Sequence, residues 1–207
     1  MLPKFVIAGT DTDIGKTVFS AALTLALGAN YWKPVQSGVE SVDTKMVQRL
    51  TGLPEDHFLP EAYVLSEPLS PHRAAEIDGV AVDVAALQIP KSARPLVIEA
   101  AGGLMVPMSR KHLQINVFKS WGLPVILCAR TGLGTLNHTL LSLEALWARK
   151  IPVHGIAFIG PANEDNMCTI AEFSGEKVLG RLPMVEPLNA QGLRAAFDTN
   201  FDVKDFV

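Results

Sequence analysis

The stretch AGTDTDIGKT, residues 8–17, decides the fold predicted for this chain. It follows a short apolar run, ends in Gly15, Lys16 and Thr17, and leads into a helical pattern. In a phosphate-binding loop of this kind, backbone N–H groups face phosphate oxygens, the lysine reaches the terminal phosphates and the threonine hydroxyl binds Mg²⁺. An ordinary strand-to-helix turn also favours Gly and Asp, but Gly-Lys-Thr is hard to obtain from that alternative. The stretch therefore predicts a nucleotide phosphate site.

The first glycine of this loop stands one residue earlier than the general pattern G-x-x-x-x-G-K-[ST] requires. Counting back from Gly15 puts Thr10 at the first position, whereas the glycine is Gly9. The loop therefore reads G-T-D-T-x-x-G-K-T. The extra residue places Thr12 and Asp13 in the loop, where a second substrate can reach them.

Short apolar runs alternate with helical patterns along the chain. The runs are continuously apolar, which is typical of strands covered on both faces. They predict strands at 4–9, 30–35, 95–100, 124–129, 153–160 and 177–183, with helices at 16–28, 44–52, 82–89, 114–121 and 136–150. This alternation predicts a single α/β domain over residues 1–207, with a mainly parallel sheet and helices on both faces. Residues 55–78 contain several prolines and no sustained period, so we expect irregular surface structure there.

Length and composition restrict the function classes. The 207 residues are 48% hydrophobic and 19% charged, which suits one globular domain. The net charge of −3 argues against a nucleic-acid or membrane-surface partner. The N-terminal apolar run is too short for a signal peptide, and Cys128 and Cys168 have neither metal-ligand spacing nor the number for a disulfide framework. We therefore expect a cytoplasmic protein that binds neither nucleic acid nor membrane.

Five motifs resemble dethiobiotin synthetases, the ligases of the biotin pathway. They are the G-T-D-T-x-x-G-K-T loop (9–17), WKPVQSG (32–38), SPHRAA (70–75), VIEAAGGLMVP (97–107) and LGTLNHTLLSLEAL (133–146). They occur in the order that this family shows and span most of the chain. Each motif alone is moderately specific, and together they form a strong resemblance.

The resemblance implies a P-loop NTPase-like α/β fold and an ATP-dependent ring closure. The substrates would be 7,8-diaminononanoate, CO₂ and ATP or another nucleoside triphosphate, with Mg²⁺ as the metal ion. An amine captures CO₂ as a carbamate, and the carbamate attacks the γ-phosphate to give a carbamic–phosphoric anhydride. The second amine then closes the cyclic urea and expels phosphate. The resemblance also implies a homodimer, because this family assembles its substrate site near a subunit interface.

The cationic groups of the implied site come from the first two motifs. Phosphoryl transfer depends mainly on positioning and on stabilisation of charge. Lys16 and Lys33 are therefore expected to flank the carbamate and the γ-phosphate as catalytic groups. Thr12, also assigned to catalysis, and Ser37 are expected to hydrogen-bond the carbamate or its amine, although Ser37 could equally be a turn residue beside Gly38.

Three oxygen-bearing side chains are expected to hold Mg²⁺, directly or through water: Thr17, Asp43 and Glu99. Glu99 ends a buried strand, where open α/β sheets place their ligands, but a carboxylate there could also cap a nearby turn. Asp43 lies in SVDTK, which is also a plausible helix N-cap. The resemblance favours the metal role for Asp43.

Nucleotide and substrate contacts extend this set. Nucleotide binding is expected at Asp13, Ile14, Gly15, Lys16, Thr17, Val18, Gly160, Pro161, Pro183, Met184 and Val185. Substrate binding is expected at Thr12, Lys33, Ser37, Gly134, Thr135, Leu136 and Asn137. A helix begins near Gly134, and its exposed N–H groups suit the carboxylate tail of the amino-acid substrate. Asn137 and His138 could instead cap that helix, and His138 is not expected to be a catalytic base.

The segment GIAFIGPANED (155–165) departs from the family pattern. The family commonly carries an Asn-Asp pair that reads adenine, and the aligned residues here are Ile159 and Gly160. Two smaller departures are Ala100, where the family usually has Gly, and Asp13, where it commonly has Glu. We therefore expect backbone groups near 160–162 and the loop LPMVEPL (182–188) to read the base, or the base to be read only loosely.

Two other functions use a similar loop. A regulatory or assembly ATPase carries a signature lysine beside the first loop position, which pairs across a nucleotide-sandwich dimer, but this chain has Asp11 there. A small-molecule kinase would phosphorylate a hydroxyl, and it would leave the Lys33 segment and the helix near Gly134 without a role. The sequence therefore favours the ligase.

Overall fold

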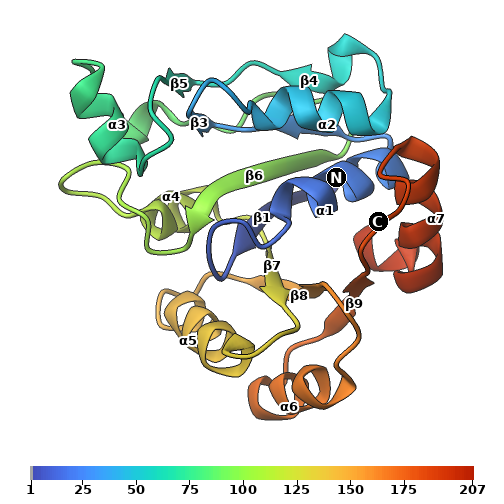
Figure 1. The fold of residues 1–207 in the computed structure, drawn as a ribbon. Helices are drawn as coiled ribbons and strands as arrows, with labels where there is room; N and C mark the ends of the chain where they lie inside the picture. The colour runs from blue at the N-terminus through green and yellow to red at the C-terminus, as the bar shows by residue number, and fades with distance from the viewer. Residues whose placement is uncertain (1) are drawn as a thin grey trace.

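The computed structural model describes residues 2–207, and its centre is a seven-stranded sheet with the order β4-β2-β6-β1-β7-β8-β9. Every neighbouring pair in this sheet is parallel. Its strands are β1 (Lys4–Gly9), β2 (Asn30–Trp32), β4 (Phe58–Leu59), β6 (Leu96–Gly103), β7 (Val125–Arg130), β8 (Val153–Ile159) and β9 (Val178–Leu182). A separate parallel pair joins β3 (Val35–Ser37) to β5 (Tyr63–Leu65). The predicted parallel α/β sheet is confirmed (Figure 1).

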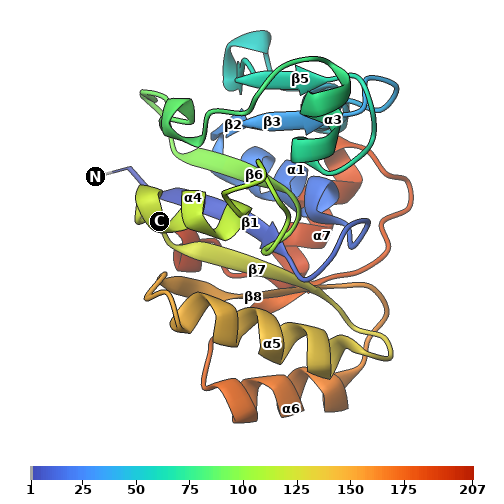
Figure 2. The same ribbon diagram turned by 90° about the vertical axis from the view of Figure 1, so that its left-hand side faces the viewer.

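Helices cover both faces of the sheet, as predicted. They are α1 (Lys16–Leu27), α2 (Asp43–Thr51), α3 (Pro71–Ile77), α4 (Gln114–Trp121), α5 (Thr135–Trp147), α6 (Glu164–Ser174) and α7 (Ala190–Asn200), with short 3₁₀ helices η1 (Glu55–His57), η2 (Val84–Ala86) and η3 (Val203–Phe206). In Figure 2, α4 and α5 lie in front of the sheet, whereas α1 and α7 lie behind it. None of the helices in the described residues is long and apolar enough to cross a membrane.

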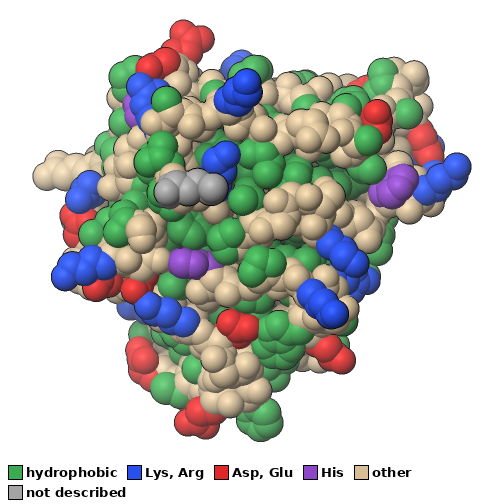
Figure 3. Space-filling view, turned by 180° about the vertical axis from the view of Figure 1, so that it is seen from behind, with side chains coloured by type: hydrophobic (Ala, Val, Ile, Leu, Met, Phe, Trp, Pro, Cys, Tyr) green, Lys and Arg blue, Asp and Glu red, His purple; other side chains and the backbone are tan. Residues whose placement is uncertain are grey.

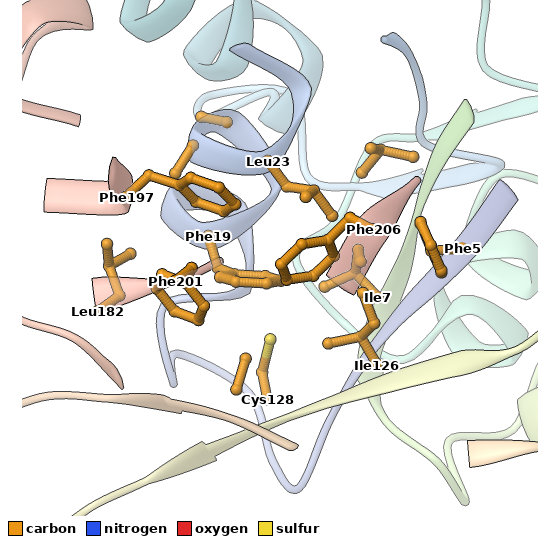
Figure 4. Packing of buried hydrophobic residues seen from close by; sticks show 14 of the residues in the cluster. Phe5, Ile7, Phe19, Leu23, Ile126, Cys128, Leu182, Phe197, Phe201 and Phe206 are labelled. Carbon is orange, nitrogen blue, oxygen red and sulfur yellow. The ribbon is translucent and has the colours of Figure 1, made fainter. Parts of the chain in front are cut away.

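The core behind the sheet is rich in phenylalanine (Figure 4). Phe197 of α7 stacks on Phe201 with ring centroids 5.0 Å apart, and Phe19 of α1 lies 5.5 Å from Phe201. Phe19, Phe197 and Phe206 are fully buried, and each such side chain contributes about 1.5–3 kcal/mol through burial. This packing fixes α1, and therefore the loop before it, against the sheet.

Three predictions of local structure were wrong or incomplete. Residues 82–89 form only η2, because Val82 and Leu87 are buried by tertiary packing and Pro90 disfavours helical backbone in the residue before it. The run 30–35 is interrupted at 33–34, so β2 and β3 belong to different sheets. Residues 55–78, expected to be irregular, contain η1, two short strands and α3, which begins at Pro71, a favoured first helical residue.

Candidate functional site

The phosphate-binding loop occupies the end of β1, beside the ends of β6 and β7. Its backbone is anchored by the N–H of Thr10, which donates to the carbonyl of Cys128 at 3.1 Å. Lys16 begins α1 and folds back over the loop, where its Nζ donates to the carbonyl of Asp11 at 2.9 Å. Arg130 at the end of β7 donates to the carbonyl of Thr12 at 2.9 Å. The loop is thus held from both sides in the form that the motif predicts.

Two glycines in the loop have no room for a side chain. A Cβ at Gly9 would lie 2.7 Å from Ile14 Cδ1 and 2.9 Å from Lys16 Cδ, so the offset glycine lets the lysine stem cross the loop. Gly15 has φ +92°, and a Cβ there would lie 2.8 Å from Ile159 Cγ2. The early position of the first glycine is therefore a packing requirement of this particular loop.

Thr17, Asp43 and Glu99 meet at the start of α1. Thr17 Oγ1 lies 2.8 Å from Glu99 Oε1 and 3.1 Å from Asp43 Oδ1. The structure therefore brings together the three side chains that the sequence assigned to Mg²⁺. Hydroxyl and carboxylate oxygens are the hard ligands that Mg²⁺ prefers, and Mg²⁺ typically keeps several waters beside one or two carboxylates, so the set fits the ion. The described residues contain no group of three or more His, Cys, Asp or Glu side chains that could hold a metal ion.

Lys33 joins the same cluster from the other side. Its Nζ lies 2.7 Å from Asp43 Oδ2 and 3.3 Å from Glu99 Oε1, and it donates to the carbonyl of Ala100 at 3.0 Å. The side chain is only 5% exposed. Burial opposes its charge, but Glu99 and Asp43 outweigh burial, so the pKa of Lys33 is raised above its ordinary value of 10.5. Lys33 is therefore a permanent cation in this site.

Lys16 has the opposite electrostatic balance. Burial is the largest influence and lowers its pKa from 10.5, although Glu99 acts in the other direction. Within residues 2–207 its ammonium group has no salt bridge, since its hydrogen bond goes to a neutral carbonyl. A buried cation with only a carbonyl partner is suited to receive an anion.

The alternative assignments made for Asp43 and Glu99 are not supported by the geometry. Helix α2 begins at Asp43, its N-cap is Val42, and no side chain caps it. The Asp43 carboxylate instead faces Thr17 and Lys33. Glu99 is 1% exposed, and its partners are Thr17, Lys33 and Tyr31 rather than a turn. Both carboxylates therefore point into the cluster.

Sequence reasoning missed two buried side chains that support this cluster. Tyr31 donates its hydroxyl to Glu99 Oε2 at 3.0 Å. Gln36 accepts the N–H of Asp43 at 3.1 Å and donates to the carbonyls of Ser37 and Gly38. Tyr31 lies in the apolar run 30–35 and reads as ordinary core. Gln36 lies in the motif WKPVQSG, but nothing in the sequence assigned it a role.

A cleft of about 440 Å³ opens beside the cluster. It is lined by Thr12, Asp13, Lys33, Gln36, Ser37, Ser41, Asp43, 68–71, Ala101, Gly102 and Val106. Ser37 Oγ is buried and has no hydrogen-bond partner, so it is available to a ligand. Thr12, Lys33 and Ser37, three of the predicted substrate residues, therefore share one cavity. An adjoining cavity of about 430 Å³, also lined by Thr12 and Val106, reaches His138 and Leu141 of α5.

The other predicted substrate residues do not line the 440 Å³ cleft. Gly134 has φ +89° and precedes α5, which begins at Thr135. Gly134 and Asn137 are exposed, whereas Thr135 is buried and donates to the carbonyl of Arg130. No side chain caps α5, so the capping alternative for Asn137 and His138 is wrong. Within one chain, the residues at the start of α5 therefore do not line the cleft that they were expected to complete.

The segments expected to hold the base lie side by side. Ile159 and Leu182 are register partners at the ends of β8 and β9, and the N–H of Gly160 donates to the carbonyl of Leu182 at 3.0 Å. Arg181 donates to the carbonyl of Gly160 at 2.8 Å. Ile159 packs against Gly15 of the phosphate loop, so the end of β8 lies next to that loop. Figure 3 shows the molecule from the side opposite to that of Figure 1. Acidic and basic side chains are interspersed on this face.

Comparison with solved structures shows the fold. The septum site-determining protein MinD of Pyrococcus horikoshii OT3, complexed with Mg-ADP, aligns over 96% of each chain with a TM-score of 0.54 and 13% identity. A ParA family ATPase from Chlorobium tepidum TLS aligns over 96% of this chain and 93% of its own, with a TM-score of 0.50 and 13% identity. At this identity the likeness concerns the P-loop architecture alone.

Comparison of sequences is more specific. A family model described as an AAA domain matches residues 3–192. The ATP-dependent dethiobiotin synthetase BioD of Rhodopseudomonas palustris (strain TIE-1) is 57% identical over 208 residues, covering 100% of this chain and 98% of its own. That of Novosphingobium aromaticivorans is 54% identical over 206 residues, covering 99% of this chain and 100% of its own. With this likeness along its whole length, the chain belongs to the family of ATP-dependent dethiobiotin synthetases.

Proposed function

We propose that this protein is a Mg²⁺-dependent cyclo-ligase that makes dethiobiotin from 7,8-diaminononanoate, CO₂ and ATP. The full-length identity with curated dethiobiotin synthetases supports the reaction. The observation that carries the site is the position of Lys33, whose Nζ lies 2.7 Å from Asp43 and 3.3 Å from Glu99 at the edge of the 440 Å³ cleft. A fixed cation between metal-type carboxylates and a substrate-sized cleft suits carbamate capture followed by phosphoryl transfer.

The phosphates of the nucleotide would bind at the loop. Backbone N–H groups of the loop and the start of α1 face the phosphate oxygens, and Lys16 supplies the cation that lacks an anionic partner in the described residues. Thr17, Asp43 and Glu99 would hold Mg²⁺ there. Bound Mg²⁺ neutralises charge on the β- and γ-phosphates. The transferred phosphoryl group would therefore lie between Lys16 and Lys33.

The diamine would bind in the 440 Å³ cleft. One amine captures CO₂ and releases a proton, and Lys33 stabilises the resulting carbamate anion. The Thr12 and Ser37 hydroxyls hydrogen-bond the carbamate or its amine, a role supported by the unpartnered Ser37 Oγ. The carbamate oxygen attacks the γ-phosphorus and ADP leaves. The second amine then attacks the carbonyl carbon, a proton is lost and phosphate leaves, which closes the cyclic urea.

The lining of the 440 Å³ cleft supports a homodimer, because it does not include the residues at the start of α5. If a second copy supplied Gly134, Thr135, Leu136 and Asn137, their N–H groups would meet the substrate carboxylate across the interface. The base of the nucleotide would lie over segments 160–161 and 183–185. Both cysteines are free thiols, which suits a cytoplasmic enzyme. Each subunit of this dimer would consist of one ligase domain.

The proposed reaction is tested by following the labelled carbon. The purified protein is incubated with 7,8-diaminononanoate, ¹³C-bicarbonate, ATP and Mg²⁺, and the product is analysed by mass spectrometry. We expect dethiobiotin with one ¹³C in its ureido carbonyl. ADP formed without incorporation of the label would contradict the ligase and would indicate a kinase acting on another substrate or a regulatory ATPase instead. Asp11 argues against the regulatory ATPase, because it is acidic where that class carries its signature lysine. Its carboxylate lies 3.9 Å from the Arg130 guanidinium of its own chain.

A further inference from the structure

Tyr31 is a buried tyrosine whose hydroxyl faces the proposed metal site. It lies on β2 with no exposed surface, and its ring packs in the core behind the sheet. Its hydroxyl donates to Glu99 Oε2 at 3.0 Å. Buried hydroxyls in a protein core are usually bonded to backbone groups, and this one is instead directed at a carboxylate proposed to bind Mg²⁺.

The two oxygens of Glu99 are divided between different partners. Oε1 lies 2.8 Å from Thr17 Oγ1 and 3.3 Å from Lys33 Nζ. Oε2 accepts from Tyr31. The phenol therefore fixes the rotation of the carboxylate, and Oε1 is the oxygen left facing Thr17 and the phosphate loop. A second hydrogen-bonding partner of this kind commonly sets the orientation of a metal ligand.

We propose that Tyr31 is a positioning residue that orients Glu99 for Mg²⁺ binding with the nucleotide. This inference rests on the metal role of Glu99 in the proposed function. Tyr31 touches neither nucleotide nor diamine in this arrangement, since it lines neither cavity beside the phosphate loop. It acts only through the carboxylate.

The geometry makes this phenol a hydrogen-bond donor. Its partner is a carboxylate oxygen, Glu99 Oε2, which accepts and does not donate. In Tyr31→Phe, Glu99 Oε2 would lose its donor while remaining buried, and the carboxylate would rotate toward other donors such as Lys33.

The test measures metal binding rather than turnover. Mn²⁺ is titrated into the protein with saturating ADP, and bound Mn²⁺ is followed by electron paramagnetic resonance. We expect Tyr31→Phe to weaken Mn²⁺ binding about 10- to 100-fold, the range typical for loss of a residue that orients a metal ligand. ADP binding in the presence of a chelator is expected to stay as in the unmodified protein.

The chain offers a matched control, because it has two tyrosines. Tyr63 on β5 accepts the N–H of Asp83 at 3.1 Å and lines neither of the two cavities. Tyr63→Phe removes one hydroxyl hydrogen bond as well, and Mn²⁺ affinity is expected to be unchanged. Equal Mn²⁺ affinity in Tyr31→Phe and the unmodified protein would overturn the role of Tyr31. Failure of the unmodified protein to bind Mn²⁺ with ADP would overturn the metal site itself.

A second measurement does not depend on the stability of a variant. The protein labelled with 3-fluorotyrosine gives two ¹⁹F resonances, which Tyr63→Phe assigns. Adding Mg²⁺ to the ADP-bound protein is expected to shift the Tyr31 resonance and leave that of Tyr63 in place, because only Tyr31 bonds a metal ligand. An unmoved Tyr31 resonance under conditions where Mg²⁺ binds would contradict the proposal.

Discussion

Lys33 Nζ lies 2.7 Å from Asp43 Oδ2, and this ion pair joins the end of β2 to the first residue of α2. The same ammonium group lies 3.3 Å from Glu99. One buried lysine therefore holds two carboxylates together beside the phosphate loop. Its charge serves the free protein as a structural counter-ion and, in the proposed reaction, would stabilise the carbamate.

Replacement of this lysine separates catalysis from nucleotide binding. In Lys33→Ala we expect turnover to be abolished while ADP binding stays measurable, because Lys16 and the loop backbone remain. The free energy of unfolding is expected to fall by about 3–5 kcal/mol, since two carboxylates lose a buried counter-ion. Lys45→Ala, which removes an exposed lysine from α2, is the control and should change neither. Retained turnover in Lys33→Ala would remove Lys33 from the catalytic groups.

The approach of Ile159 to Gly15 predicts a strict requirement for glycine. Gly15→Ala would force a Cβ to within 2.8 Å of Ile159 Cγ2 at φ +92°, and the loop would shift from its phosphate-binding form. We expect ADP binding to be lost, as measured by calorimetry. Gly28→Ala is the matched control: it has φ +55° but nothing within 4 Å, so only the backbone strain is shared. If both variants bind ADP equally, the loop tolerates a side chain and this packing argument is wrong.

The lowered pKa of Lys16 predicts a proton linked to nucleotide binding. Bound phosphates would raise that pKa, so the complex holds more protons than the free protein at alkaline pH. At alkaline pH the phosphates of ADP are already ionised, and we expect ADP binding to take up protons and to weaken as pH rises further. Calorimetry in buffers of different ionisation enthalpy measures this uptake. Proton release at that pH would contradict the assignment of Lys16.

Base selection is expected to be weak. Ile159 packs on Gly15 and cannot replace the adenine-reading Asn that the resembled family commonly carries. In the proposed function the base lies over segments 160–161 and 183–185, and no side chain of these segments is assigned to read adenine. We expect comparable rates of dethiobiotin formation with ATP, CTP and GTP, measured at saturating diamine. A strong preference for ATP would show that another group reads adenine.

The sequence predicted those parts of the molecule that short-range patterns encode. The phosphate loop, the strand runs and α1 each depend on neighbouring residues, and the structure reproduces them. The helix expected at 82–89 failed because burial of Val82 and Leu87 overrides local periodicity. Helix α3 was missed because the prolines around it suggested a loop, although Pro71 is suited to a first helical turn.

The individual residues of the candidate site could be predicted from the sequence, but the contacts between them could not. The motifs predicted Thr17, Asp43 and Glu99 as site residues, and the structure brings each of the two carboxylates within hydrogen-bonding distance of Thr17. Tyr31 was not predicted, because its role depends on β2 and β6 lying side by side in the sheet. Which residues line the 440 Å³ cleft also depends on the whole fold, and the start of α5 is not among them.

In the proposed reaction, conversion of ATP to ADP and phosphate is coupled to ring closure at the site formed by Lys16, Lys33, Thr17, Asp43 and Glu99. The most direct measurement is phosphate release with ATP and Mg²⁺, with and without 7,8-diaminononanoate and bicarbonate. We predict that release requires both and equals the dethiobiotin formed. Phosphate release that is independent of the diamine would contradict the ligase function.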